Sequence, residues 1–126
     1  MSNQINSDEA AKPIAAYSQA VRAGDLVFVS GCIPIDPLTG VLISDTIENA
    51  TAQSLTNVRN VLIGADLSLN DVVKASVFII NPEDYSGMNK AYAKIMPQPY
   101  PAREAIFVKG LPKGARIEIS VIAHSK

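Results

Sequence analysis

The stretch Ala115-Arg116-Ile117-Glu118-Ile119-Ser120-Val121-Ile122-Ala123 alternates between apolar and polar side chains. Its odd-numbered positions are all apolar, and its even-numbered positions are polar except for Ile122. Successive side chains of a strand point to opposite faces of a sheet. The stretch therefore predicts a strand with one face against a core and the other at a wetter surface or an interface.

A second strand is expected immediately before it, over residues 102–109, with Arg103 on the same side as Ala105 and Phe107. The connection Gly110-Leu111-Pro112-Lys113-Gly114 is short and carries turn-forming residues. Short connections join antiparallel neighbours. We therefore expect these last two strands to pair directly.

The earlier part of the chain predicts a hairpin, a helix, a strand and a second helix. The hairpin covers residues 16–22 and 26–31 around a turn at 23–25. Apolar residues at helical spacing predict a helix over 46–65, opened by a capping box with Asp45 as the N-cap and Glu48 three residues later. A β-branched strand over 72–80 precedes a helix that begins at Asn81-Pro82. The order ββαβαββ predicts an α+β fold, a sheet with two helices packed on one face.

The composition sets the wider limits. The chain has 126 residues, 48% of them hydrophobic, and a formal net charge of −1, which predicts one domain over 1–126 with an aliphatic core. We expect residues 1–12, polar and acidic, to be poorly ordered or peripheral. The chain has one cysteine and shows neither a secretory signal nor a long apolar run. We therefore expect a cytoplasmic protein without a membrane partner. The lack of a clustered Lys/Arg footprint argues against a nucleic-acid partner.

Two helices on one face leave the other face of the sheet uncovered. Because the residues of that face are half apolar, we expect it to associate with further copies of the chain in a closed homo-oligomer.

Arg103 and Glu118 are the residues most able to carry chemistry. The guanidinium of Arg103 could bind a carboxylate ligand through two parallel hydrogen bonds, or it could pair with Glu118 on the adjacent strand of its own chain. Residue pattern alone favours the structural pair. Glu118 has two interpretations as well. Beside an arginine it would stay ionised, whereas in a dry pocket its pKa would rise and it could exchange protons with water.

The other candidates have plain structural alternatives. Tyr17 begins a strand, where an aromatic residue more often packs than reacts. Ser30-Gly31 ends a buried strand, where glycine allows a ligand close to the backbone or marks a bulge. Cys32 is typical of a small buried hydrophobe, and His124 of a solvated terminus. No Cys, His or carboxylate cluster has the spacing of metal ligands, and no glycine-rich phosphate loop is present.

Several stretches together resemble the RidA family, also known as YjgF or endoribonuclease L-PSP, across nearly the whole chain. They are Pro13-Ile14-Ala15-Ala16-Tyr17-Ser18-Gln19-Ala20-Val21, Phe28-Val29-Ser30-Gly31-Cys32-Ile33-Pro34, Asp36-Pro37-Leu38-Thr39-Gly40, Tyr100-Pro101-Ala102-Arg103 and Leu111-Pro112-Lys113-Gly114-Ala115-Arg116-Ile117-Glu118-Ile119, with Gln53-Ser54-Leu55-Thr56-Asn57-Val58 and residues 72–78 between them.

The resemblance implies a chorismate-mutase-like α+β fold assembled as a homotrimer, with sites between neighbouring subunits. It implies hydrolytic deamination of reactive 2-imino acids to 2-oxo acids and ammonia, without a cofactor. Arg103 would hold the substrate carboxylate, Glu118 would serve the hydrolytic water, and Tyr17 would complete the catalytic set. The substrate-binding positions it implies are Arg103, Tyr17, Ser30, Gly31, Cys32, Ala105 and Asn89.

Three positions depart from the pattern of this family. Ala105 stands where many relatives have a cysteine, so no thiol mechanism can run from that position. Ala15-Ala16 replaces the usual Gly-Pro before the tyrosine, and Cys32 replaces the usual glutamine. These departures bear on substrate preference more than on fold. Cys32 near the pocket also raises the hypothesis of a redox-sensitive thiol.

Two other functions compete with imine hydrolysis. A ribonuclease without a metal normally needs a general acid–base pair, and the sequence offers one peripheral histidine and no basic stripe. A non-catalytic module that binds small carboxylates or a regulatory partner would need only Arg103 as its anchor. Chorismate mutase shares the fold class, but fold alone carries no function.

Overall fold

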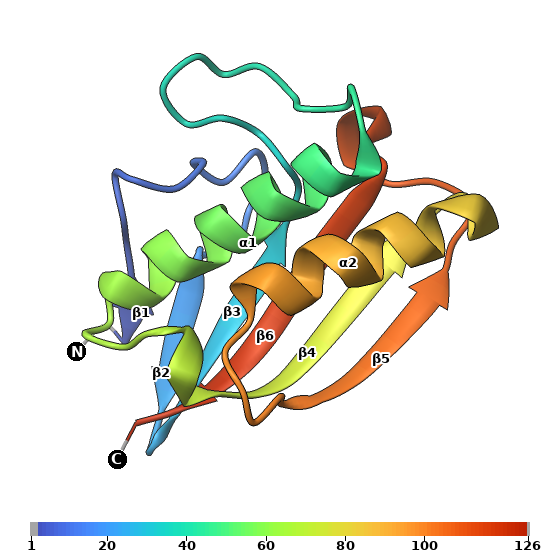
Figure 1. Ribbon diagram of the computed structural model, residues 1–126. Coiled ribbons are helices and arrows are strands. Elements are labelled where there is room, and N and C mark those ends of the chain that lie inside the picture. The colour runs from blue at the N-terminus through green and yellow to red at the C-terminus, as the bar shows by residue number, and fades with distance from the viewer. Residues whose placement is uncertain (1–2, 126) are drawn as a thin grey trace.

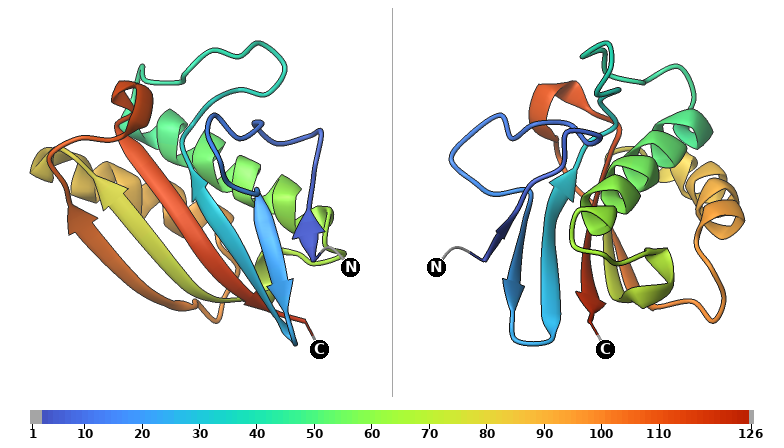
Figure 2. Two further views of the ribbon diagram at one scale, coloured as in Figure 1. Left: turned by 180° about the vertical axis from the view of Figure 1, so that it is seen from behind. Right: turned by 90° about the vertical axis from the view of Figure 1, so that its left-hand side faces the viewer.

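The computed structural model describes residues 3–125 and shows a six-stranded sheet with two long helices on one face (Figure 1). The strands are β1 (Gln4–Ile5), β2 (Ala20–Ala23), β3 (Leu26–Cys32), β4 (Val72–Ile79), β5 (Ala102–Phe107) and β6 (Ile117–His124). The helices are α1 (Ile47–Ile63) and α2 (Tyr85–Ile95), with 3₁₀ turns η1 (Leu69–Asp71), η2 (Pro82–Asp84) and η3 (Pro112–Gly114). The expected α+β class is confirmed, and the opposite face of the sheet lies open (Figure 2).

Strand β6 lies inside the sheet, between β3 and β4 and antiparallel to both, in the order β1-β2-β3-β6-β4-β5. Its apolar side chains at 117, 119, 121 and 123 are each at most 3% exposed and belong to the main core. Its even-numbered residues are only partly buried, and they point to the face without helices. The alternation predicted for this stretch is confirmed.

The expected pairing of the last two strands is wrong. Strand β5 pairs in parallel with β4 at the edge of the sheet, and β6 pairs with the other side of β4. A parallel pair needs a crossover connection, and η2 with α2 supplies it between β4 and β5. Residues 108–116 then carry the chain past β4, because they can span the roughly 10 Å of two strand spacings.

The element boundaries differ from the expected ones mainly at their ends. Thr46, not Asp45, is the N-cap of α1, and its hydroxyl accepts a hydrogen bond from the N–H of Asn49. Asp45 instead accepts from the N–H of Thr46 and the side chain of Asn49. Asn81 makes no side-chain cap, and η2 intervenes before α2 begins at Tyr85. Asp45 and Thr46 are adjacent, and both side chains are good N-caps. Residue spacing alone does not show which of the two caps the helix.

The N-terminal segment supplies a strand that the pattern did not predict. Strand β1 pairs with β2 at the sheet edge, and Ile5 and Ala10 are buried. The side chain of Gln19 holds the segment by accepting from the N–H of Ser7 and donating to the carbonyls of Ser7 and Ala11. Residues 1 and 2, which the predicted peripheral segment includes, lie outside the described residues.

None of the described helices is long and apolar enough to cross a membrane.

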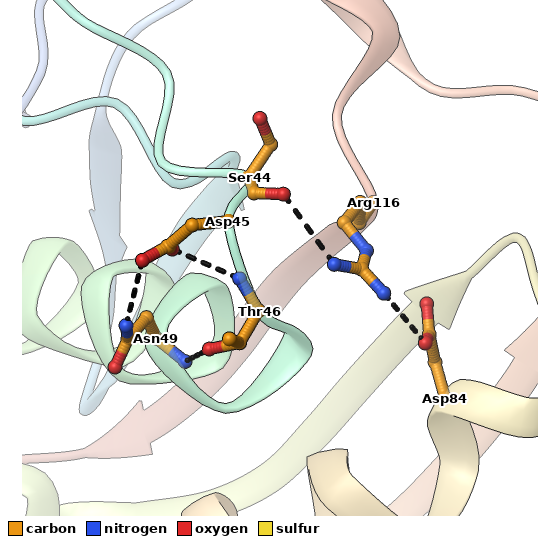
Figure 3. A network of polar contacts seen from close by, with 6 residues as sticks. All are labelled: Ser44, Asp45, Thr46, Asn49, Asp84 and Arg116. Carbon is orange, nitrogen blue, oxygen red and sulfur yellow. Dashed lines mark hydrogen bonds and ion pairs between the residues drawn. The ribbon is translucent and has the colours of Figure 1, made fainter.

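An ion pair joins the start of β6 to the start of α2. Figure 3 shows the Arg116 guanidinium between the carboxylate of Asp84, at 2.8 Å, and the carbonyl of Ser44, at 3.4 Å. Asp84 is only 5% exposed, and a buried carboxylate without a paired cation would be destabilising. The pair fixes the loop before α1, the N-terminus of α2 and the entry to β6 relative to one another.

Asn57 fixes the backbone that follows β3. It is 1% exposed, and its amide nitrogen donates to the carbonyls of Ile33 at 3.2 Å and Ile35 at 2.8 Å. Gln53 donates in turn to the amide oxygen of Asn57 at 3.1 Å. A segment without regular pairing thus has its buried carbonyls satisfied from α1.

Replacing Asn57 with alanine should lower the free energy of unfolding by about 1–3 kcal/mol, because the carbonyl of Ile35 loses its donor, while that of Ile33 keeps the N–H of Ile35. Urea denaturation measures the loss. Asn60→Ala on the same helix is the matched control. Its side chain bonds the carbonyl of Glu9 at an exposed position, where water can replace it, so a loss below about 1 kcal/mol is expected. Equal losses in the two variants would contradict this account.

Candidate functional site

Arg103 and Glu118 lie on opposite faces of the sheet in one chain. On β4, Ala75 pairs with Arg103 and Phe78 with Glu118. Ala75 is fully buried under the helices, so Arg103 is on the helix side. Phe78 is three positions further along the strand, so it and Glu118 point to the open face. The expected pair between Arg103 and Glu118 within one chain is therefore wrong, because β4 separates them.

The Arg103 side chain occupies a pocket of about 290 Å³ between the edge strand β5 and α2. The pocket is lined by Asn89, Tyr92, Ala93, Tyr100 and Arg103. The ion pairs among the described residues are Lys74–Glu104 and Arg116–Asp84, so Arg103 has no carboxylate partner there. A cation that its own chain leaves without a counter-charge is suited to an anionic ligand.

The neighbours of this guanidinium are uncharged residues of α2. The ring of Tyr92 lies 4.9 Å from the guanidinium carbon, and the Met88 sulfur lies 3.8 Å from one terminal nitrogen. The other terminal nitrogen is 3.5 Å from the hydroxyl of Tyr85. The three residues recur at the spacing of one helix face, a pattern that predicts packing against a core and carries no separate signal for a role beside an arginine.

Glu118 lines a second pocket, of about 460 Å³, on the open face. Its lining is mostly apolar and comprises Ile14, Ala15, Tyr17, Ser30, Gly31, Ile33, Pro112 and Glu118. Burial raises the pKa of Glu118 above the ordinary value of a glutamate. A carboxyl group of this kind can exchange a proton with water closer to neutral pH than an exposed one.

A bulge in β3 and the lack of a side chain at Gly31 make room for Glu118. The pairing of β3 with β6 shifts register between Val29 and Cys32. A Cβ atom at position 31 would stand 2.6 Å from the carboxyl carbon of Glu118. Both interpretations of Ser30-Gly31, bulge and close approach, therefore apply, although the group that approaches is a side chain of the same protein.

Tyr17 and Ser30 hold the loop that borders the Glu118 pocket. The hydroxyl of Ser30 donates to the carbonyl of Ser18 at 2.6 Å. The phenol oxygen of Tyr17 accepts a long hydrogen bond from the N–H of Ile14 at 3.4 Å, which leaves its own proton free to donate. The side chain of Tyr17 is 43% exposed, so it is not a core residue.

The three remaining predicted positions lie on elements around the two pockets, and of the three only Asn89 lines one of these pockets. Asn89 lines the Arg103 pocket, and Ala105 shares the face of Arg103 and packs against the main core. Cys32 packs against the same core from β3, with its thiol directed to the carbonyl of Ser30. Burial, with the charge of Glu118 as a second cause, raises the pKa of the Cys32 thiol to about 12. That value favours a buried hydrophobe over a redox-sensitive thiol.

The eight predicted positions thus lie at two half-sites, one with a cation on the helix side and one with a proton-exchanging carboxyl on the open face. One small molecule cannot contact both half-sites of a single chain. A second copy whose Arg103 edge reaches the open face would bring them together. Among residues 3–125, no three His, Cys, Asp or Glu side chains are grouped to hold a metal ion.

Comparison with known proteins gives consistent matches. The family model described as Endoribonuclease L-PSP matches residues 7–125. A RutC family protein of Pyrococcus horikoshii is 42% identical over the full length of both chains. The chloroplastic Reactive Intermediate Deaminase A of Arabidopsis thaliana is 36% identical over 94% of this chain and 64% of its own. The crystal structure of Escherichia coli TdcF with bound serine superposes with a TM-score of 0.91 at 33% identity, covering 98% of each chain.

Substituting Gly31 with alanine should push the Glu118 carboxylate away from the β3 backbone and toward water. The pKa of Glu118 should then fall toward the ordinary glutamate value, since burial is what raises it. Carbon-13 NMR titration of the carboxyl group measures this. Gly110→Ala, where an added Cβ meets no atom within 4 Å, is the control and should leave the pKa of Glu118 as it is. An unchanged pKa in Gly31→Ala would refute the close packing.

The thiol of Cys32 should react with iodoacetamide at pH 8 roughly a thousandfold more slowly than free cysteine, since a pKa of about 12 leaves almost no thiolate. Mass spectrometry of timed samples gives the rate. In denaturant the same thiol should react at the ordinary rate. Fast alkylation of the folded protein would restore the redox hypothesis.

Proposed function

The chain belongs to the endoribonuclease L-PSP family, also called the RidA family, and we propose that it hydrolyses reactive 2-imino acids to 2-oxo acids and ammonia. The observation that carries the proposal is the division of chemistry between the two half-sites. Arg103 is a cation without a counter-ion among residues 3–125, and Glu118 is a carboxyl with a raised pKa in an apolar pocket. A substrate with a carboxylate beside an electrophilic carbon uses both groups.

The reaction needs few groups because a protonated imine is already a strong electrophile. The guanidinium of Arg103 binds the substrate carboxylate and holds the imine carbon in place. Glu118 accepts a proton from a water molecule as the water oxygen bonds to that carbon. The same carboxyl returns this proton to the nitrogen, and its carboxylate then takes the proton of the new hydroxyl group as the C–N bond breaks. The products are ammonia and a 2-oxo acid, and the proton on Glu118 passes to ammonia or water. Tyr17, with its phenol proton free, can donate to the substrate from the pocket border.

The proposal includes a homotrimer in which Arg103 of one copy faces Glu118 of the next. The open face of the sheet carries exposed apolar side chains, among them Val21, Phe28 and Ile106. Strand β5, which carries Arg103, is an edge strand with one side unpaired. When the free β5 edge of one copy contacts the open sheet face of the next copy, the same contact can repeat around a closed ring.

The relatives support the substrate class. The Arabidopsis relative is named a reactive intermediate deaminase, and the TdcF structure contains serine, a small molecule with a carboxylate. In the proposed site Asn89 and Ala105 accompany Arg103, while Ser30 and Gly31 line the Glu118 pocket and Cys32 follows them on β3. A binding module without turnover is the competing function, and the experiment below separates the two. A cytoplasmic location stays a prediction from the sequence.

Wild-type protein should remove 2-iminobutanoate, generated in place from an amino acid by an oxidase, before semicarbazide can trap it. Arg103→Ala should lose at least about a hundredfold in kcat/KM, since a charge-assisted bidentate anchor contributes several kcal/mol. Absorbance of the semicarbazone reports the trapping. Binding of 2-oxobutanoate without any suppression of trapping would favour the binding module. RNA cleavage that disappears in Arg103→Ala would favour the ribonuclease.

Mixing two inactive variants tests where the site lies. Arg103→Ala and Glu118→Gln, each inactive alone, should recover activity when co-expressed, because some interfaces then join an intact Arg103 to an intact Glu118. Random assembly leaves about one quarter of the sites intact. Co-expression of Arg103→Ala with a second copy of itself is the control. No recovery in mixed oligomers confirmed by native mass spectrometry would place both groups in one chain and contradict the interface site.

A further inference from the structure

The support of the Arg103 guanidinium is unusual for a charged group at the border of a core. Arginines at such positions are commonly fixed by a carboxylate, as Arg116 is by Asp84 at 2.8 Å. Arg103 is fixed instead by the face of a tyrosine ring, a thioether and a distant hydroxyl. Of these neighbours only Tyr92 presents a broad surface, with its ring centre 4.9 Å from the guanidinium carbon.

We propose that Tyr92 is a positioning residue, whose ring face orients the Arg103 guanidinium for a carboxylate ligand without neutralising its charge. The inference rests on the proposed function, because it takes Arg103 as the carboxylate anchor. It adds a residue that the sequence motifs do not assign to the site.

An arginine that anchors a carboxylate ligand must keep both its charge and its N–H donors available. A carboxylate partner in the same chain would hold the side chain still, but it would occupy the donors and cancel the charge that a ligand needs. An aromatic face attracts the cation through its quadrupole and takes no N–H donor in the guanidinium plane. A guanidinium over a ring face therefore uses no N–H donor for that contact and loses rotational freedom before the ligand arrives.

The ring is itself well placed to act as a rigid platform. Tyr92 is 5% exposed and belongs to the main core, so neighbouring side chains fix its orientation. A second ring, that of Tyr100, lies 6.5 Å away and lines the same pocket. The platform thus comes from the helix side of the molecule, whereas the reacting carbon would lie near Glu118 of another copy.

The hydroxyl group of Tyr92 is not what supports Arg103. Its oxygen is buried and has no hydrogen-bond partner among the described residues. Removing it therefore breaks no hydrogen bond that the structure shows, and Tyr92→Phe keeps the ring. A role of the ring face and a role of the hydroxyl can be separated by this one substitution.

The test measures binding of 2-oxobutanoate, a stable carboxylate ligand, by titration calorimetry at one fixed salt concentration, alongside imine turnover. Tyr92→Leu should weaken the Kd about tenfold and raise KM by a similar factor, with kcat within about twofold, since the chemistry takes place at Glu118. Tyr92→Phe should restore the wild-type Kd and KM. Loss of affinity in Tyr92→Phe equal to that in Tyr92→Leu would show that the hydroxyl contacts the ligand and would overturn the proposal.

A fluorinated series covers the case in which Tyr92→Leu fails to fold. Phenylalanine, 4-fluorophenylalanine and 3,4,5-trifluorophenylalanine at position 92 have similar shapes, but the negative potential of the ring face weakens with each fluorine. Affinity for 2-oxobutanoate should fall stepwise while Tm stays level. Equal affinities across the series would overturn the proposal.

The binding series also separates this inference from the proposed function. Wild-type protein that binds 2-oxobutanoate but turns over no imine would refute the hydrolase, and the series would still decide the role of Tyr92. Wild-type protein that binds no 2-oxo acid would overturn the positioning role itself, because Arg103 would then anchor no carboxylate.

Discussion

The burial of one face of β6 against α1 and α2 is the constraint on which the rest of the structure depends. Its odd-numbered side chains are at most 3% exposed and lie in the main core, which fixes the register of the strand. A shift by one residue would place Glu118 in that core, at a cost of several kcal/mol. The position of Glu118 on the open face is therefore a consequence of apolar packing on the other face. The same alternation on β4 and β5 directs Arg103 toward the helices.

Separation of the two charges has a chemical consequence. Had Arg103 and Glu118 paired within the chain, the arginine would lose its capacity for a ligand and the glutamate would stay ionised with a low pKa. Strand β4 prevents that pair and leaves each group in a pocket of its own. Burial can then raise the pKa of Glu118, and an aromatic ring can support Arg103 without neutralising it. The proposed function uses two groups that cannot satisfy each other inside one copy.

Local signals predicted the elements well and their neighbours less well. Alternation in β6, helical spacing in α1 and α2, and the turn before β3 depend on adjacent residues, and the structure confirms them. The predicted pairing of β5 with β6 was wrong. A short connection between two strands does not show whether a third strand, here β4, lies between them in the sheet. Tyr92 carried a clear helical signal, but a side chain that packs in a core and one that supports a cation have the same spacing.

The amino-acid sequence alone determined the α+β class, the two-sidedness of the last strand and the family to which the chain belongs. These properties follow from periodicities of two and of about 3.6 residues and from short motifs, all of which are local. Only the tertiary structure decided that β4 lies between Arg103 and Glu118, that Gly31 makes room for the glutamate, and that Tyr92 lies under the arginine. These facts join residues far apart in the chain, and their placement depends on the packing of the whole sheet against its helices.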